Sequence, residues 1–122
     1  MWNPNSQKYD LVDPKELQFT QESIKDSFTK AHSGVKLQDT VSDIKAGRLD
    51  PSSLGPLAAH RGNDGGLWCE NNRRLYVYRE VGVPSVPVKI KSNDFISRRL
   101  GEETREKLSD PNFVPKVRSS GM

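Results

Sequence analysis

The sequence predicts a small α+β domain, and three features of the 122-residue chain support that class. Its length suits a single domain. Residues 37–44 carry leucine, valine and isoleucine at the i, i+4 and i+7 spacing of an amphipathic helix. Residues 86–90 alternate apolar with other side chains, as a β-strand does. Only 33% of residues are hydrophobic, so we expect a lean core.

The N-terminal part is expected to contribute a strand and a helical turn. We interpret residues 1–8 as a flexible lead-in and residues 9–13 as a short strand that ends at a turn-prone Asp-Pro pair. Residues 20–24 are polar apart from Ile24. Because Phe28 lies at i+4 from Ile24, the spacing predicts a helical turn there.

The middle of the chain is expected to form a helix followed by a β-hairpin. The amphipathic pattern predicts the helix over residues 37–46. The second half of the apolar run 54–59 is interpreted as a strand, because its proline suits a strand start. The glycine-rich residues 61–66 predict a tight turn, and residues 67–70 the returning strand.

A second helix is predicted directly after that hairpin. Asn71 and Asn72 are favoured helix N-cap residues, and apolar residues then recur at i, i+3 and i+6 from Leu75. Gly82 is expected to end the helix, and residues 83–90 return as a strand.

The predicted domain covers residues 9–90, with residues 91–122 as a C-terminal extension that is partly irregular. Phe95, Ile96 and Leu100 are expected to anchor a short helix there. The basic end from residue 116 onward is expected to be loose, as chain termini commonly are.

Charge is distributed unevenly along the chain. Residues 1–59 carry 7 basic and 8 acidic side chains, whereas residues 60–122 carry 12 basic and 8 acidic ones. The basic half favours an anionic partner such as a nucleotide or nucleic acid, although ordinary surface lysine and arginine would give the same balance.

No apolar run is long enough for a membrane span, and the first residues lack the pattern of a secretory signal. The single cysteine, Cys69, rules out an internal disulfide and fits a reducing compartment, while the cellular location itself stays open.

The start of the second predicted helix has the chemistry of a phosphate site. The first N–H groups of a helix lack intrahelical partners, and the macrodipole makes that end positive. Arg73 and Arg74 oppose the dipole there, and a bound phosphate would compensate because arginine grips phosphate with charge-assisted bonds. The alternative is that these arginines pair with an acidic neighbour such as Glu70 or Glu80.

Residues 71–90 contain, in order, an Asn-Arg-Arg-Leu box, the predicted helix, its terminal glycine and a Val-Pro-Val strand. This run resembles the signature of the ParB/sulfiredoxin superfamily. The likeness is closest to the ParB-like nuclease domains of polymorphic toxins. It covers about residues 9–90, and it is most specific over 71–90. Residues 19–24 are similar, more weakly, to the early polar motif of the family.

This resemblance implies a small mixed β-sheet with packed helices and a phosphate site at the box. Members hydrolyse nucleoside triphosphates with Mg²⁺, transfer phosphate, or act as nucleases. Mg²⁺ or Mn²⁺ is therefore the implied cofactor, although no ligand set for it is apparent. The phosphate contacts implied by the resemblance are collected here: Asn71, Asn72, Arg73 and Arg74 of the box, with Gln21 and Ser23 as weaker contributions from the early motif.

Two departures from the family pattern bear on activity. Asn71 stands where relatives often have glycine or an acid, and an amide binds a hard cation less well than a carboxylate does. Sulfiredoxin carries its reactive cysteine within the box, whereas Cys69 precedes the box here and is expected to point into the core. The sulfiredoxin reaction is therefore not expected.

Two functions follow from these residues. The first is a phosphoester-cleaving, nuclease-like domain in which Glu70 or His60 supplies acid–base or metal help. The second is a non-catalytic module that binds a nucleotide or nucleic acid, or serves as an adaptor with a protein partner. Structural alternatives are a salt bridge for Glu70 and a solvated hairpin position for His60.

Overall fold

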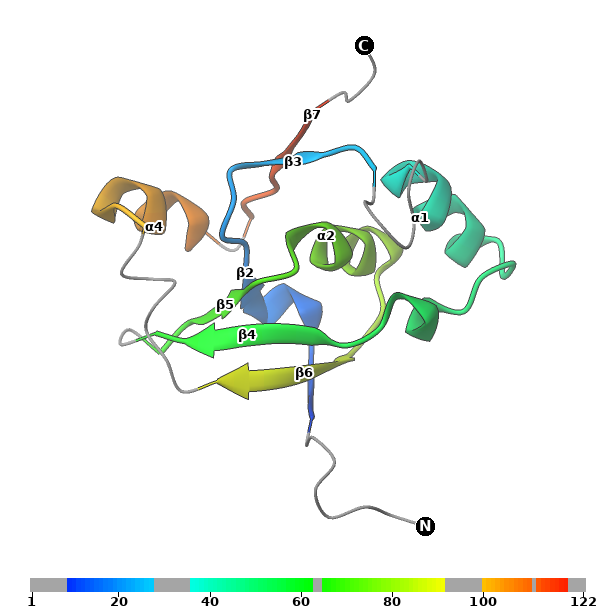
Figure 1. Cartoon of the computed structure of the whole chain (residues 1–122), viewed down its shortest axis with the longest axis horizontal. Helices are drawn as coiled ribbons and strands as arrows, with labels where there is room; N and C mark the ends of the chain where they lie inside the picture. The colour runs from blue at the N-terminus through cyan, green and yellow to red at the C-terminus, as the bar shows by residue number, and fades with distance from the viewer. Residues whose placement is uncertain (1–8, 28–35, 63–64, 92–99, 111, 119–122) are drawn as a thin grey trace.

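The computed structural model describes residues 9–27, 36–62, 65–91, 100–110 and 112–118. The predicted lead-in over residues 1–8 and the helix anchors Phe95 and Ile96 lie outside these ranges. The described part is a mixed α/β fold in which helices pack on a mixed sheet, as the α+β prediction requires (Figure 1).

The main sheet has five short strands in the order β1-β6-β4-β5-β2. These strands are β1 (Asp10–Val12), β2 (Leu17–Gln18), β4 (Leu57–Arg61), β5 (Leu67–Cys69) and β6 (Val86–Lys91). Strands β4 and β6 are parallel at the centre, β4 and β5 form the predicted antiparallel hairpin, and β1 and β2 form the two edges. Parallel and antiparallel pairs therefore share one sheet.

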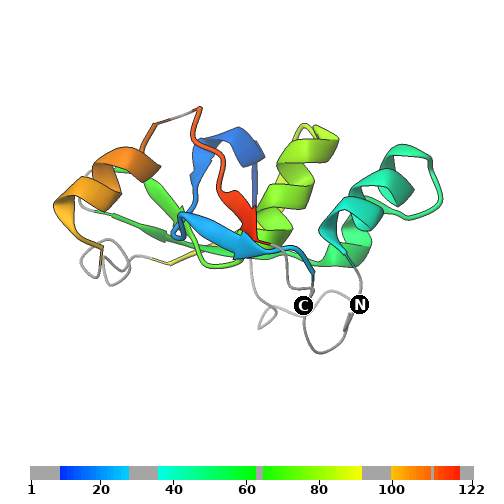
Figure 2. The ribbon, with the colours of Figure 1, turned by 90° about the horizontal axis from the view of Figure 1, so that it is seen from above.

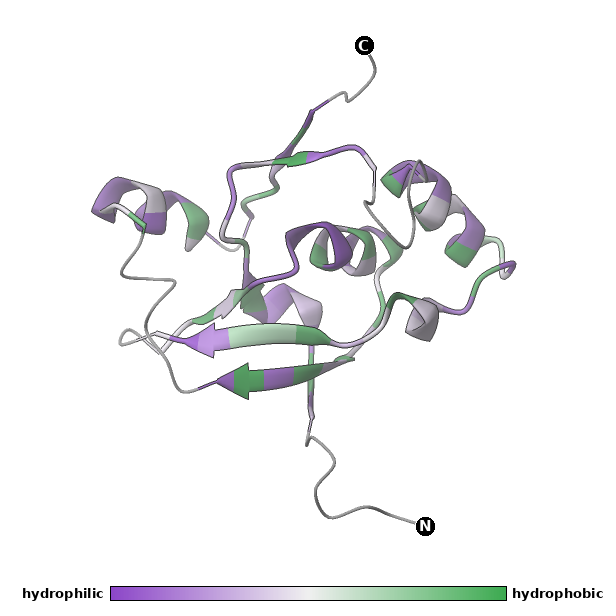
Figure 3. Ribbon diagram, in the orientation of Figure 1, coloured by the Kyte–Doolittle hydropathy of each residue, from purple (hydrophilic) through white to green (hydrophobic). Residues whose placement is uncertain are grey.

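The two faces of the sheet differ because side chains alternate along each strand. On β6, Val86 and Val88 are buried, whereas Lys89 and Lys91 belong to the alternate set. The register pairs Lys89 with Ala58 and Lys91 with His60, so these residues share the face opposite Val88. The colour change along β6 in Figure 3 shows the same alternation between green and purple.

Helix α2 (Asn72–Val81) packs against the apolar face of the sheet. Its buried residues Leu75, Val77 and Tyr78 lie in the common core with Trp68. Helix α1 (Leu37–Lys45) packs beside α2 through the predicted apolar stripe (Figure 2). Short 3₁₀ helices η1 (Pro14–Glu16) and η3 (Pro51–Leu54) lead into β2 and β4.

Two predictions about the ends of the chain are wrong. Residues 20–24 do not form a helical turn, and residues 116–118, which were expected to be loose, form a strand. Strand β3 (Ser23–Lys25) pairs in parallel with β7 (Lys116–Arg118) in a separate two-stranded sheet. Ile24 anchors this pair in the core with 1% exposure. Figure 1 shows β3 on the side of α2 that faces away from β4 and β6, and β3 contacts α2 directly.

Helix α4 (Glu102–Leu108) belongs to the C-terminal extension, and the apolar pattern did not predict it. Six of its seven residues are polar, and only Leu108 is fully buried. Its charges follow the macrodipole, with Glu102 and Glu103 in the first turn and Lys107 in the last. Lys107 also forms an ion pair with Glu22 at 2.7 Å, which ties the helix to the segment before β3.

Candidate anion-binding site

Asn71 occupies the N-cap position of α2, as predicted, but its side chain does not cap the helix. Its Oδ1 atom accepts a hydrogen bond from the backbone N–H of Ala58 at 2.8 Å. Its own N–H contacts Cys69 Sγ at 3.4 Å. Asn71 therefore fastens the start of α2 to the start of β4.

Asn72 is 6% exposed, and its side chain is directed to Thr20. Its Oδ1 accepts from the Thr20 N–H at 2.7 Å, and its Nδ2 donates to Thr20 Oγ1 at 2.8 Å. The Thr20 hydroxyl in turn donates to the Cys69 carbonyl at 2.9 Å. Asn72 thus holds the chain after β2 against the end of β5, and both ends of its amide are occupied by protein.

The two arginines of the box diverge. Arg73 Nη1 donates to the Ser27 carbonyl at 2.9 Å, on the side of α2 where β3 lies. Arg74 Nη1 donates to the Pro56 carbonyl at 3.2 Å, beside the start of β4. Within the described ranges neither guanidinium pairs with a carboxylate, so the alternative pairing with Glu70 or Glu80 is not observed.

The loop before β4 positions the acceptor for Arg74. The hydroxyl of Tyr78 in α2 donates to the Gly55 carbonyl at 2.7 Å and lies 3.3 Å from the Pro51 carbonyl. Gly55 has a φ of 85° and a ψ of 172°, a conformation that is essentially limited to glycine. This turn brings Pro56 under the guanidinium of Arg74.

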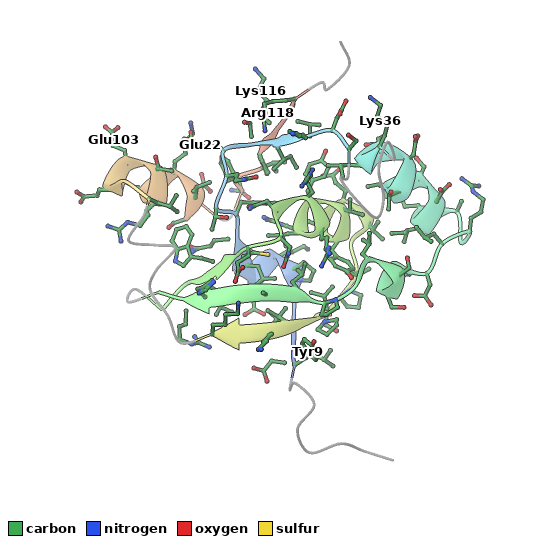
Figure 4. The ribbon with its side chains drawn as sticks, in the orientation of Figure 1. Tyr9, Glu22, Lys36, Glu103, Lys116 and Arg118 are labelled. Atoms are coloured by element: carbon green, nitrogen blue, oxygen red, sulfur yellow. The ribbon has the colours of Figure 1, made fainter. Side chains whose placement is uncertain are left out.

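A hollow of about 290 Å³ opens between this loop, the first turn of α2 and strand β6. Its lining consists of Tyr9, Pro56, Leu57, Ala58, Asn71, Arg74, Lys89 and Lys91. The lining includes three cationic side chains and no carboxylate. Figure 4 shows Tyr9 where the chain enters β1, at the opposite end of the view from Lys116 and Arg118 of β7. The hollow is therefore separate from the basic residues of the small sheet.

Glu70 and His60, the predicted catalytic pair, lie together at the edge of this hollow. Glu70 Oε2 is 2.5 Å from His60 Nε2 and 3.1 Å from Lys91 Nζ. The side chain of His60 is 9% exposed and that of Glu70 is 33% exposed. His60 Nδ1 is buried, with no hydrogen-bond partner in the described part of the chain.

The surroundings of Glu70 favour its charged form. Burial alone would raise the pKa of this carboxyl, but the hydrogen bonds and positive charges of Lys91 and His60 outweigh that effect and lower the pKa below its ordinary value. Glu70 is thus a carboxylate at neutral pH, and it neutralises Lys91. The structural alternative expected for Glu70, a salt bridge, is therefore present, but its partner is Lys91 rather than Arg73 or Arg74.

The donor set around the hollow fits a resident Mg²⁺ or Mn²⁺ ion poorly. The lining contains no carboxylate, and the Glu70 carboxylate that pairs with Lys91 of the lining already uses one oxygen to contact Lys91 and His60. The Asn71 oxygen, the other candidate ligand, accepts from Ala58. Over the described residues no three His, Cys, Asp or Glu side chains come together as a metal site.

The remaining predicted residues lie elsewhere. Gln21 is exposed in the segment before β3, and Ser23 begins β3, so neither lines the hollow. Cys69 is fully buried, as predicted, and burial raises the pKa of its thiol to about 12. A thiol of this kind is almost entirely protonated at neutral pH.

Sequence reasoning missed Tyr9, Lys89 and Lys91. The two lysines alternate with apolar residues in β6. This alternation indicated that one face of the strand is polar. What the pattern could not show is that β6 lies next to β4, which brings Lys91 beside His60.

No family model matches this chain, and no curated protein matches its sequence. None of the helices in the described ranges has the length and apolar character needed to cross a membrane.

Proposed function

We propose that this chain binds the phosphate group of a nucleotide or nucleic acid in the hollow beside α2. The observation that carries the proposal is the lining itself, which contains Arg74, Lys89 and Lys91 and no carboxylate, while Glu70 next to it pairs with Lys91. Cations gathered at a concave surface create a positive potential that attracts anions. Arginine binds phosphate through paired, charge-assisted hydrogen bonds, and lysine binds it as a point charge.

The state of Arg74 supports this proposal. Its guanidinium uses one nitrogen to bind a backbone carbonyl, which orients the group but leaves its charge without a counter-ion in the described structure. The group offers five N–H donors, so several remain for a ligand. Asn71 adds the NH₂ of its amide, because its oxygen is committed to β4.

We also infer membership of the ParB/sulfiredoxin superfamily. The order of elements supports it: strand β5, the Asn-Arg-Arg box, helix α2, a glycine in the left-handed conformation and strand β6 follow one another. Gly82 has a φ of 86°, which suits the terminal glycine of the signature. Within this family pattern we assign phosphate binding to Arg74 and Asn71, and positioning of the chain to Asn72 and Arg73.

The arginine pair provides a matched test of phosphate binding. Arg74→Gln and Lys89→Gln remove charge from the hollow, whereas Arg73→Gln removes the same charge one residue away from Arg74 and outside the lining. Calorimetric titration with inorganic phosphate and with mononucleotides should show binding reduced at least tenfold in the first two variants and near the wild-type value in the third. Equal losses in all three variants would point to diffuse electrostatic attraction and would contradict the assigned site.

Phosphoester cleavage is a second candidate, and the contact between Glu70 and His60 beside Lys91 is the observation that favours it. In a hydrolytic reaction Glu70 would accept a proton from the attacking water, and Arg74 would stabilise the charge that develops on phosphate. The lowered pKa of Glu70 makes it a weak base, and His60 is almost covered. We therefore rank cleavage below binding.

One variant separates the two candidates. Glu70→Gln removes the negative charge that neutralises Lys91, so a binding site should hold phosphate more tightly. A hydrolytic site should instead lose its activity. Incubation of wild type and Glu70→Gln with plasmid, single-stranded DNA and RNA, with and without Mg²⁺ or Mn²⁺, reads out cleavage. Cutting by the wild type that the variant lacks would place hydrolysis first.

A further inference from the structure

The lining of the hollow also indicates which phosphate compound it accepts, an inference that rests on the proposed phosphate binding. We propose that the hollow takes a single nucleotide unit that carries one phosphate, with the base against Tyr9. The shared chemistry is that of a nucleoside monophosphate and of the phosphorylated terminal nucleotide of a single strand. Charge, size and the aromatic rim each contribute to this assignment.

The positive charges that the hollow offers match a ligand with one phosphate group. Lys91 is already paired with Glu70 at 3.1 Å, so its charge is largely neutralised before a ligand enters. Arg74 and Lys89 have no carboxylate partner in the part of the chain that the structure describes. The two positive charges of Arg74 and Lys89 match a terminal phosphate, which carries roughly −1.5 to −2 at neutral pH. A triphosphate would bring more negative charge than these groups neutralise.

The volume of the hollow matches that of one nucleotide unit. Its volume of about 290 Å³ lies just below the roughly 300–1,000 Å³ that ligand pockets in proteins span. A single unstacked nucleotide can enter.

Tyr9 supplies a surface for the base. It immediately precedes β1, whose register pairs Asp10 with Val88, so that continuing the ladder by one residue places Tyr9 opposite Lys89. The residue is 42% exposed, unlike the buried aromatic Trp68 and Phe19 of the core. An exposed ring at the rim of a cationic hollow is the arrangement on which bases stack in single-strand binding proteins.

The test is a calorimetric titration without metal of a graded series of probes: inorganic phosphate, ribose 5-phosphate, AMP, ATP, and a short oligoadenylate with a 5′-phosphate or a 5′-hydroxyl, so that every nucleotide probe carries the same base. We expect AMP or the 5′-phosphorylated oligonucleotide to bind roughly 5- to 150-fold more tightly than ribose 5-phosphate, the range that stacking of one base provides. ATP should bind no more tightly than AMP. The tighter of the two favoured probes identifies the source of the nucleotide.

Two variants of Tyr9 isolate the base contribution. Tyr9→Phe keeps the ring and should retain the preference for AMP, whereas Tyr9→Leu should reduce AMP binding to the level of ribose 5-phosphate. Equal binding of AMP and ribose 5-phosphate by the wild type would overturn the nucleotide assignment and leave the phosphate site intact. ATP binding more than tenfold tighter than AMP would overturn the single-phosphate assignment. Absence of binding by every phosphate probe would refute the proposed function itself.

Discussion

Replacing Asn72 with alanine separates a structural role for this residue from a role in ligand binding. The amide of Asn72 is buried and makes two hydrogen bonds to Thr20, at 2.7 and 2.8 Å. Thr20 connects the amide to the Cys69 carbonyl through its hydroxyl. The substitution therefore removes both contacts between the start of α2 and the chain after β2, while it leaves Arg74 and the hollow in place.

The expected loss follows from those contacts. Each hydrogen bond contributes about 0.5–1.5 kcal/mol net, and a half-buried N–H of Thr20 left without its acceptor adds a penalty near the low end of about 1–3 kcal/mol. The free energy of unfolding should thus fall by about 2–4 kcal/mol. For a chain of this length, about 1 kcal/mol corresponds to roughly 4 °C in Tm, so Tm should fall by about 8–16 °C.

Urea unfolding monitored by circular dichroism measures this change. A double-mutant cycle with Thr20→Val, which keeps the shape of the side chain and removes its hydroxyl, should give a coupling energy of about 1 kcal/mol for the amide–hydroxyl bond. Titration with phosphate below the Tm of the variant should show nearly wild-type affinity. A loss of stability under about 0.5 kcal/mol together with lost phosphate binding would refute the reasoning and make Asn72 a ligand contact.

Three further outcomes are expected from the same structure. Because the pKa of Glu70 is lowered in the folded protein, its ion pairs stabilise the fold above the ordinary value of 4.5 and lose that effect as pH falls below it. The difference in stability between wild type and Glu70→Gln should therefore shrink between pH 6 and pH 3 in urea titrations, and a constant difference would contradict this. Gly82→Ala should lower the free energy of unfolding by roughly 1–2 kcal/mol, because Gly82 has a φ of 86°, which a residue with a Cβ atom adopts only with strain. The added Cβ atom would meet no neighbouring atom, so backbone strain is the whole expected cost, and an unchanged Tm would show that the helix end rearranges. The pKa of Cys69, raised to about 12, should make its thiol inert to iodoacetamide at pH 7.5 until denaturant is added, whereas rapid labelling of the native protein would disprove its burial.

The regular elements with local patterns could be predicted from the sequence. The stripe of residues 37–44 formed α1, the alternation in residues 86–90 formed β6, and the glycine-rich turn formed the hairpin of β4 and β5. Each of these signals lies within one element, because hydrophobic periodicity reports which face of that element is buried. The burial of Cys69 followed from its apolar neighbours in the same way.

Elements stabilised by distant partners could not be predicted. Residues 23–25 become a strand only because Lys116–Arg118 lies beside them, and the spacing of Ile24 and Phe28 suggested a helical turn instead. The split within the box has a similar cause. Neighbouring positions on a helix point in different directions, so Arg73 and Arg74 look equivalent in the sequence but reach opposite sides of α2.

The pairing of β3 with β7 has a consequence for how the chain folds. Ser23 meets Lys116, so almost the whole described sequence separates the two partners of this parallel ladder. Contacts of such long range form late, since the entropy of closing the loop must be overcome before they contribute stability. During synthesis the sheet and α2 can assemble while Ile24 still lacks its partner strand. We therefore expect the pair of β3 and β7 to form after the main sheet, and the full free energy of unfolding to depend on residues 116–118.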